Sequence, residues 1–156
     1  MHNTYNRFQQ HLSVLFNLTV LYLFLNGCIY HLLQRKQPVA DNIVVRQLSS
    51  SYNGFSFRFV PNVDFTEDFK NAGLKQVFVY LKVRSGGLQE EMAWSLIMRR
   101  DTKNKKLNET LATTYNMIHR PAPGDMLLVE LRANYFPYIG IIEDKKLGDV
   151  LLTYGQ

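Results

Sequence analysis

The chain has few of the residues that build covalent or metal cross-links. It contains one cysteine, Cys28, and four histidines among 156 residues. A single cysteine excludes an intrachain disulfide, and no set of cysteines and histidines has the spacing of a zinc site. The folded part must therefore be held together by packing alone. At this length the chain has room for one domain and one appendage.

Charge is also scarce at the N-terminal end. Before Gln34 the only charged side chain is Arg7, which leaves 17 basic and 13 acidic side chains for the rest of the chain. The formal net charge is +5, and no basic run is longer than two residues. Nucleic-acid-binding surfaces usually show clustered basic residues, so this distribution does not favour one. A weak attraction to anionic lipid headgroups requires fewer assumptions.

The uncharged segment is long enough to cross a membrane. From Leu12 to Leu33 there are 22 residues without Asp, Glu, Lys or Arg. As a helix this stretch would extend about 33 Å, close to the thickness of a hydrocarbon core. Arg35 and Lys36 follow it, as is usual at a membrane boundary. The pattern predicts a transmembrane helix over residues 11–34.

Three other interpretations of this segment are weaker. A buried helix of a soluble protein would need more surrounding protein than the remaining chain, about 120 residues, provides. A cleaved signal peptide would have an apolar core of only about 7–15 residues ending at small residues. The stretch Leu25–Cys28 faintly resembles a bacterial lipoprotein cleavage site, but apolar residues follow it where a flexible polar tether is expected.

Two asparagines lie inside the predicted span. At 100° per residue Asn17 shares a face with Ser13, whereas Asn26 shares roughly the opposite face with Tyr22. An asparagine that faces lipid gains nothing, whereas a hydrogen bond between helices is worth about 0.6–2 kcal/mol. We therefore expect Asn17 and Asn26 to contact the helices of membrane partners.

A short linker follows the span. Only residues 34–42 precede the first β-branched residues, so we expect the next domain to lie against the bilayer surface. The flanking charges do not decide the orientation, because Arg7 lies before the span and Arg35, Lys36 and Arg46 lie after it. Large domains that follow a span are also often translocated regardless of charge.

Beyond the linker, short runs rich in β-branched and aromatic residues alternate with turn residues. Apolar residues at alternate positions from Val77 to Val83 line one face of a strand, and Phe78 and Tyr80 lie on the other, which suggests a strand covered on both sides. The predicted strands are Ile43–Leu48, Phe55–Val60, Leu74–Val83, Met92–Arg100, Leu111–Ile118, Met126–Ala133 and Leu147–Tyr154. Seven short strands without an internal repeat predict an all-β fold, an antiparallel β-sandwich preceded by one N-terminal transmembrane α-helix.

The β region shows no catalytic pattern. His119 is its only histidine, and no serine lies in a nucleophile elbow or a Ser-x-x-Lys motif. The cluster of Asp64, Glu67 and Asp68 lacks the regular spacing and the glycine of a calcium loop. We therefore predict no enzymatic activity, no metal site and no cofactor. Asn108 begins an Asn-Glu-Thr glycosylation acceptor, which would be used only in a luminal domain.

Several short stretches of the sequence follow one another in an order that can be compared with known protein families. The head Met1–Gln10 leads directly into the span, and the most specific piece runs from Asp64-Phe65 through Phe69 into Lys75–Leu81. The later pieces are Trp94 with Ile97, Tyr115, Leu127–Leu131, Pro137–Gly140 and Val150–Tyr154. Along most of the chain this order resembles signal peptidase complex subunit 3 of the endoplasmic reticulum. There are departures: Ser95 stands where that family usually has Asp, its tryptophan before the Lys-Gln pair is absent, and Asn108 does not align with its usual glycosylation site.

The resemblance implies a single-pass type II protein of the endoplasmic reticulum membrane. Residues 1–10 would form a short cytoplasmic head, 11–34 the transmembrane helix and 35–156 a luminal β-sandwich domain. The protein would be a non-catalytic accessory subunit that helps to assemble and position the catalytic subunit, which removes signal peptides from nascent secretory proteins. Its partners would be that catalytic subunit, the other subunits of the complex and membrane lipid.

Two other functions remain open in the sequence. A membrane-anchored ligand or binding module of the trimeric cytokine type is also a type II β-sandwich, although such ligands usually carry a stalk that residues 34–42 hardly provide. A membrane-tethered hydrolase would need a reactive group, which a broad serine or cysteine probe would label.

Overall fold

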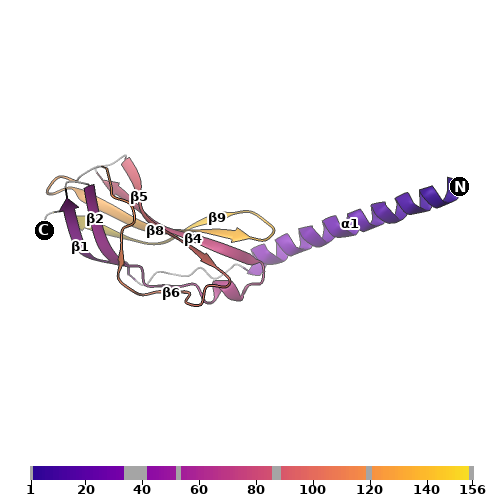
Figure 1. Ribbon diagram of the computed structural model, residues 1–156, viewed down its shortest axis with the longest axis horizontal. Coiled ribbons are helices and arrows are strands. Elements are labelled where there is room, and N and C mark those ends of the chain that lie inside the picture. Colours follow the sequence, from indigo (N-terminus) through magenta and orange to yellow (C-terminus); the bar gives the residue numbers. More distant parts are fainter. Residues whose placement is uncertain (1, 34–41, 52–53, 86–88, 119–120, 155–156) are drawn as a thin grey trace.

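The computed structural model of the protein describes residues 2–33, 42–51, 54–85, 89–118 and 121–154. One helix, α1 (His2–Leu33), extends away from a domain of antiparallel strands (Figure 1). The elements of this domain are β1 (Val44–Ser51), β2 (Gly54–Val60), β3 (Val63–Asp64), the 3-10 helix η1 (Asp68–Lys70), β4 (Leu74–Ser85), β5 (Gln89–Arg99), β6 (Lys106–Leu107), β7 (Leu111–Ala112), β8 (Met126–Pro137) and β9 (Glu143–Thr153). The predicted fold class, an all-β domain preceded by one apolar helix, is therefore confirmed.

Helix α1 is long and apolar enough to cross a membrane over Asn6–Ile29, where the mean hydropathy is 1.9. None of its most apolar stretch is buried against the rest of the protein. A helix that is apolar on every side needs lipid or other helices around it. By length and composition it fits a membrane anchor or a signal sequence. The helix also includes residues 2–10, which we expected to precede the span, and most of the predicted linker lies outside the described residues.

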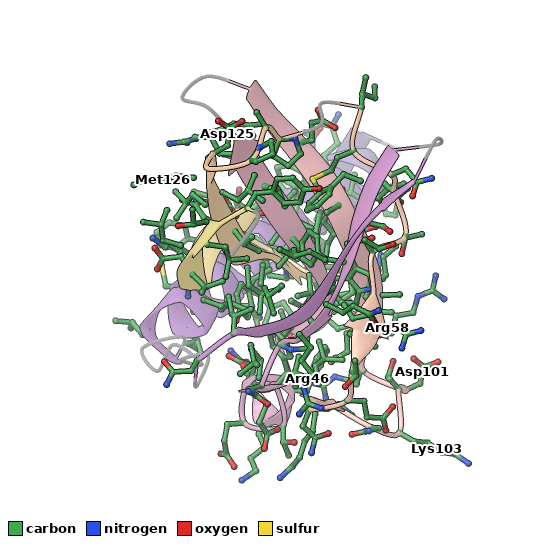
Figure 2. All side chains as sticks on the ribbon, turned by 90° about the vertical axis from the view of Figure 1, so that its left-hand side faces the viewer. Arg46, Arg58, Asp101, Lys103, Asp125 and Met126 are labelled. Carbon is green, nitrogen blue, oxygen red and sulfur yellow. The ribbon has the colours of Figure 1, made fainter. Side chains whose placement is uncertain are left out.

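Two larger sheets face each other to form a sandwich. One has the strand order β5-β4-β8-β9 and the other β1-β2-β7, while β3 and β6 pair in a small two-stranded ribbon. Aromatic rings join the two sheets: Phe59 of β2 meets Trp94 of β5 edge-on, with 5.5 Å between the ring centroids. Figure 2 shows the side chains gathered between the sheets, with Arg58 and Met126 pointing outward on opposite sides.

The core follows from the alternation of apolar residues along the central strands. On β4 the side chains of Val77, Val79 and Leu81 are fully buried, and β8 buries Val129 and Leu131 in the same way. Fully burying each such side chain contributes about 1.5–3 kcal/mol relative to leaving it in water. The face that we predicted to be buried on β4 is therefore the face that carries the core.

The predicted strand over Leu111–Ile118 is the main error, because only Leu111–Ala112 pairs as a strand. The amide of Thr113 donates to the carbonyl of Phe57 in β2 at 3.0 Å. The next two amides both donate to the carbonyl of Ala93 in β5, each at 3.0 Å. Residues 113–117, here called the bridging segment, thus bond to both sheets in turn. A segment that alternates between two sheets does not extend either of them as a regular strand.

The bridging segment ends against the start of β2. The amide of Met117 donates to the carbonyl of Phe55 at 3.1 Å. Gly54, at φ +131°, permits this approach, because a Cβ atom there would lie 2.9 Å from the Met117 carbonyl oxygen. A glycine at this corner is therefore required by both conformation and space.

Strand β9 begins at Glu143, four residues before the predicted start at Leu147. The additional residues are charged, so their apolar periodicity is low. Lys145 nevertheless lies over the ring of Tyr135 at 5.0 Å from its centroid and pairs with Glu143 at 3.0 Å. Charge pairing along the strand and a cation–π contact across it take the place of apolar alternation.

We expect Leu81→Ala to lower the free energy of unfolding by about 2–5 kcal/mol, because Leu81 is fully buried between the sheets and the substitution leaves a cavity. Urea unfolding of the detergent-solubilised full chain, followed by the fluorescence of the only tryptophan, Trp94, measures the loss. The matched control Leu151→Ala changes a side chain that is 61% exposed and should shift stability by about 0.5 kcal/mol or less. Equal losses from the two changes would contradict the placement of Leu81.

Candidate interaction surface

The four-stranded sheet has a second face, here called the outer face, that points away from the three-stranded sheet. Phe78 and Tyr80 of β4 lie on it, half-buried, with their rings stacked at 5.6 Å between centroids and 23° between planes. Ile97 of β5 pairs with Phe78 in the register and is 51% exposed. The strand is thus fully buried on one face and partly open on the other, so the expected cover over Phe78 and Tyr80 is incomplete.

A hydrogen-bonded ion pair borders this aromatic centre. Arg132 of β8 binds Asp144 of β9 through Nη2 at 2.6 Å and Nε at 3.1 Å, and the Tyr80 hydroxyl donates to Asp144 at 3.2 Å. Burial and then the Asp144 carboxylate raise the pKa of Tyr80, and the hydrogen bond with Asp144 raises the pKa of Arg132. At neutral pH the tyrosine stays neutral and the arginine stays charged. This group is suited to binding and positioning, not to proton transfer.

More ion pairs lie along the outer face towards the β4–β5 hairpin. Glu90 of β5 binds both Lys82 and Arg84 of β4, and the hydrogen bond from Lys82 lowers the pKa of Glu90. The outer face therefore has an apolar centre with charged residues around it. Protein–protein interfaces commonly have this arrangement, an apolar centre within a polar rim.

A polar contact joins β5 to the bridging segment at the edge of this face. The Ser95 hydroxyl lies 3.1 Å from the hydroxyl of Tyr115, and Ser95 pairs with Tyr80 in the β4–β5 register. Either hydroxyl can be the donor, so this contact links the edge strand to the bridging segment without a charge.

The acidic cluster noted in the sequence is divided among separate partners. Asp64 accepts a hydrogen bond from the Thr66 amide at 2.8 Å and pairs with Lys106 at 3.0 Å. The hydrogen bond with Thr66 is the main cause that lowers the pKa of Asp64 to about 2. Glu67 pairs with Lys70 at 2.6 Å. Among the described residues, no group of three or more His, Cys, Asp and Glu side chains is placed to hold a metal ion.

The residues singled out in the sequence lie in separate places. Asn108 is exposed between β6 and β7. Asn17 is exposed on α1, and within the described part of the chain its side chain makes no hydrogen bond. Asn26 is half-buried and donates to the Tyr22 carbonyl at 2.8 Å, so its amide already has one partner within the helix. His119 lies outside the described residues.

Sequence reasoning missed the group formed by Tyr80, Arg132 and Asp144. Alternation along β4 places Tyr80 on the outer face, but its neighbours come from strands more than fifty residues further along the chain. Only the register of β4, β8 and β9 brings them together. Comparison of the chain with protein-family models and with curated proteins gives no match.

Burial raises the pKa of Asp68 to about 6, while the charge of Lys145 partly opposes the shift. An unfolded aspartate ionises near 3.8, so the folded protein holds this proton more tightly. Stability from this group is therefore greatest below about pH 4 and falls as the pH rises to about 6. Because an asparagine side chain does not ionise, Asp68→Asn should add about 1–2 kcal/mol at pH 7.5, after allowance for solvent screening.

Urea midpoints of the parent chain and the variant between pH 4 and 7.5 test this expectation. Asp64→Asn is the matched control, because the lowered pKa of Asp64 gives stability that is complete above about pH 4 and lost only towards pH 2. Its difference from the parent should stay constant over the same range. A constant difference for Asp68→Asn as well would contradict the burial of that carboxyl group.

Proposed function

We propose that this chain is a non-catalytic accessory subunit of the signal peptidase complex in the endoplasmic reticulum. In this proposal α1 is a type II membrane anchor and the β domain lies in the lumen. The main observation in its favour is that the chain leaves two apolar surfaces uncovered. The apolar stretch of α1 is not buried by the rest of the protein, and the aromatic side chains of the outer face are only partly buried. An accessory subunit needs a membrane surface and a luminal surface for its partners.

The residues behind the family resemblance support the proposal through their positions in the domain. Phe65, Phe69 and Trp94 are buried, and Lys75–Leu81 lies in β4, the strand that pairs with both β5 and β8. The resemblance therefore covers the residues on which the sandwich depends, not a scattered set of surface positions. This supports a fold shared with the resembled family.

The chemistry of the outer face supports binding in preference to catalysis. Its central aromatic pair offers apolar contact area with little conformational freedom to lose, and the Arg132–Asp144 pair offers directional hydrogen bonds. In the proposed complex the outer face contacts the luminal part of the catalytic subunit. The short connection to α1 keeps that contact close to the membrane, where the signal peptide is cut.

The proposal is tested by a mild-detergent pull-down through a C-terminal tag, with mass spectrometry of the partners. We expect the catalytic signal peptidase subunit in an amount comparable to the tagged chain.

Replacing both Asn17 and Asn26 by leucine should weaken this recovery about 3-fold or more, because each interhelical hydrogen bond is worth about 0.6–2 kcal/mol. Of the two single changes, Asn17→Leu should weaken the recovery more than Asn26→Leu, because the Asn26 amide already donates within α1.

The matched control is Val14→Leu with Phe24→Leu, which changes the shape of α1 without removing a polar group. Recovery of the tagged chain alone would overturn the proposed function, and its self-association into trimers would favour a membrane-anchored ligand. Full recovery with both asparagines replaced would refute only their proposed role in helix contacts.

The luminal orientation gives a separate prediction at Asn108. In sealed microsomes the chain should gain one glycan, seen as a mobility shift that an endoglycosidase removes, because Asn108 is exposed and begins an acceptor triplet. Asn108→Gln and Thr110→Ala should each abolish the shift. Asn17→Gln should leave it unchanged, because Asn17 lies within the span.

A protease-protection assay on a C-terminal tag in the same microsomes separates the two ways in which this prediction could fail. A protected tag without a shift would mean a luminal domain that is not glycosylated. A digested tag would contradict the type II orientation.

A further inference from the structure

The end of the β domain nearest α1 carries an exposed apolar turn. Between β8 and β9 the chain presents Tyr138, Ile139, Ile141 and Ile142, which are 60%, 38%, 81% and 55% exposed. In Figure 1 this turn lies at the end of the domain from which α1 extends. Four large apolar side chains in one five-residue turn lose contact with water only when another phase or molecule covers them.

The start of the turn is anchored to the domain. The amide of Tyr138 donates to the carbonyl of Gly73 at 2.9 Å, immediately before β4. Pro137 pairs with Leu74 in the β4–β8 register. The apolar tip is therefore anchored to the start of the central strand and projects from the domain at a defined place.

Basic side chains lie beside this turn. Lys75, Arg99 and Arg100 line an open hollow of about 550 Å³ together with Gln76, Asp101 and Tyr138. Arg100 donates to the Asn71 carbonyl, and the Lys75 and Arg99 side chains form no ion pair with any residue that the structure describes. Three cations with one carboxylate give the hollow a positive excess, which suits phosphate oxygens.

We propose that Tyr138–Ile142 inserts into the headgroup boundary of the same bilayer that α1 crosses, while Lys75, Arg99 and Arg100 bind the phosphates of its lipids. An apolar tip with cations beside it is the arrangement of membrane-surface binding segments. A tyrosine at the edge of such a tip also suits the interface, where its ring lies in the apolar layer and its hydroxyl in water.

Two observations favour lipid over a protein partner as the cover of this turn. The turn is on the same side of the domain as α1, and the ten residues between Leu33 and Val44 span at most about 35 Å, so the domain cannot move far from the bilayer. The charge beside the tip is also complementary to anionic headgroups. The inference requires that α1 lies in a membrane, and it holds whether or not the chain belongs to a signal peptidase complex.

The test uses the full chain in vesicles of phosphatidylcholine and phosphatidylserine. The single cysteine allows a clean label: Cys28→Ser removes it, and Ile141→Cys introduces one at the tip for an environment-sensitive dye. Spin-labelled lipids should quench the dye at position 141. A dye on Ala122→Cys should not be quenched, because Ala122 is exposed near Asp125 at the far end of the domain, the end that faces the viewer in Figure 2.

Charge removal tests the lipid-phosphate part. Lys75→Gln with Arg99→Gln should lower the ratio of inserted to free turn about 5-fold for each cation removed in the anionic vesicles, and much less in phosphatidylcholine alone. The matched control Arg46→Gln with Arg58→Gln removes the same charge from exposed positions on the other sheet (Figure 2) and should have little effect. An equal effect of the two pairs would overturn the assignment of these cations.

Absence of quenching at position 141 in anionic vesicles would overturn the insertion itself. If the dye at 141 shifted to the blue only after a partner protein was added, without quenching by lipid, a protein would cover the turn and the proposal would be wrong. Equal quenching at 122 and 141 would mean that the whole domain lies on the bilayer without a specific contact at the turn, which also overturns it.

Discussion

The whole domain depends on packing between two sheets, because the chain has one cysteine and no possible internal disulfide. That packing centres on β4, which lies between β5 and β8 and sends one row of side chains into the core. The edge-on contact of Phe59 with Trp94 joins the sheets near this row. A smaller core side chain on β4 would weaken the packing of both sheets, because a close-packed interior relaxes only partly around a cavity.

The same strand also defines the surface available to partners. A period of two residues that buries Val77, Val79 and Leu81 necessarily places Phe78 and Tyr80 on the opposite side. The core and the outer face are thus two consequences of one alternation, and a slip of one residue in register would exchange them. The ion pairs around Tyr80 act against such a slip, because Arg132 and Asp144 meet it only in the observed register.

Most of the fold could be predicted from local patterns, and the failures have clear physical reasons. Helix α1 follows from the long uncharged segment, and the central strands follow from apolar residues at alternate positions. The bridging segment was predicted as a strand because its composition is that of a strand, whereas its amides bond to two different sheets. The start of β9 was missed because Glu143 and Lys145 satisfy each other by charge. The group formed by Tyr80, Arg132 and Asp144 depends on the register of β4, β8 and β9. That register joins strands far apart in the chain and cannot be derived from the local pattern of one sequence.

The bridging segment has a mechanical consequence. Its amides bond to Phe57 and Phe55 on one sheet and to Ala93 on the other, so main-chain hydrogen bonds cross between the layers of the sandwich. In a sandwich held by side chains alone, the two layers can slide past each other when one of them is pulled. Here the hydrogen bonds of the bridging segment give a load on the four-stranded sheet a main-chain route to β2, which adds resistance to shear between the layers.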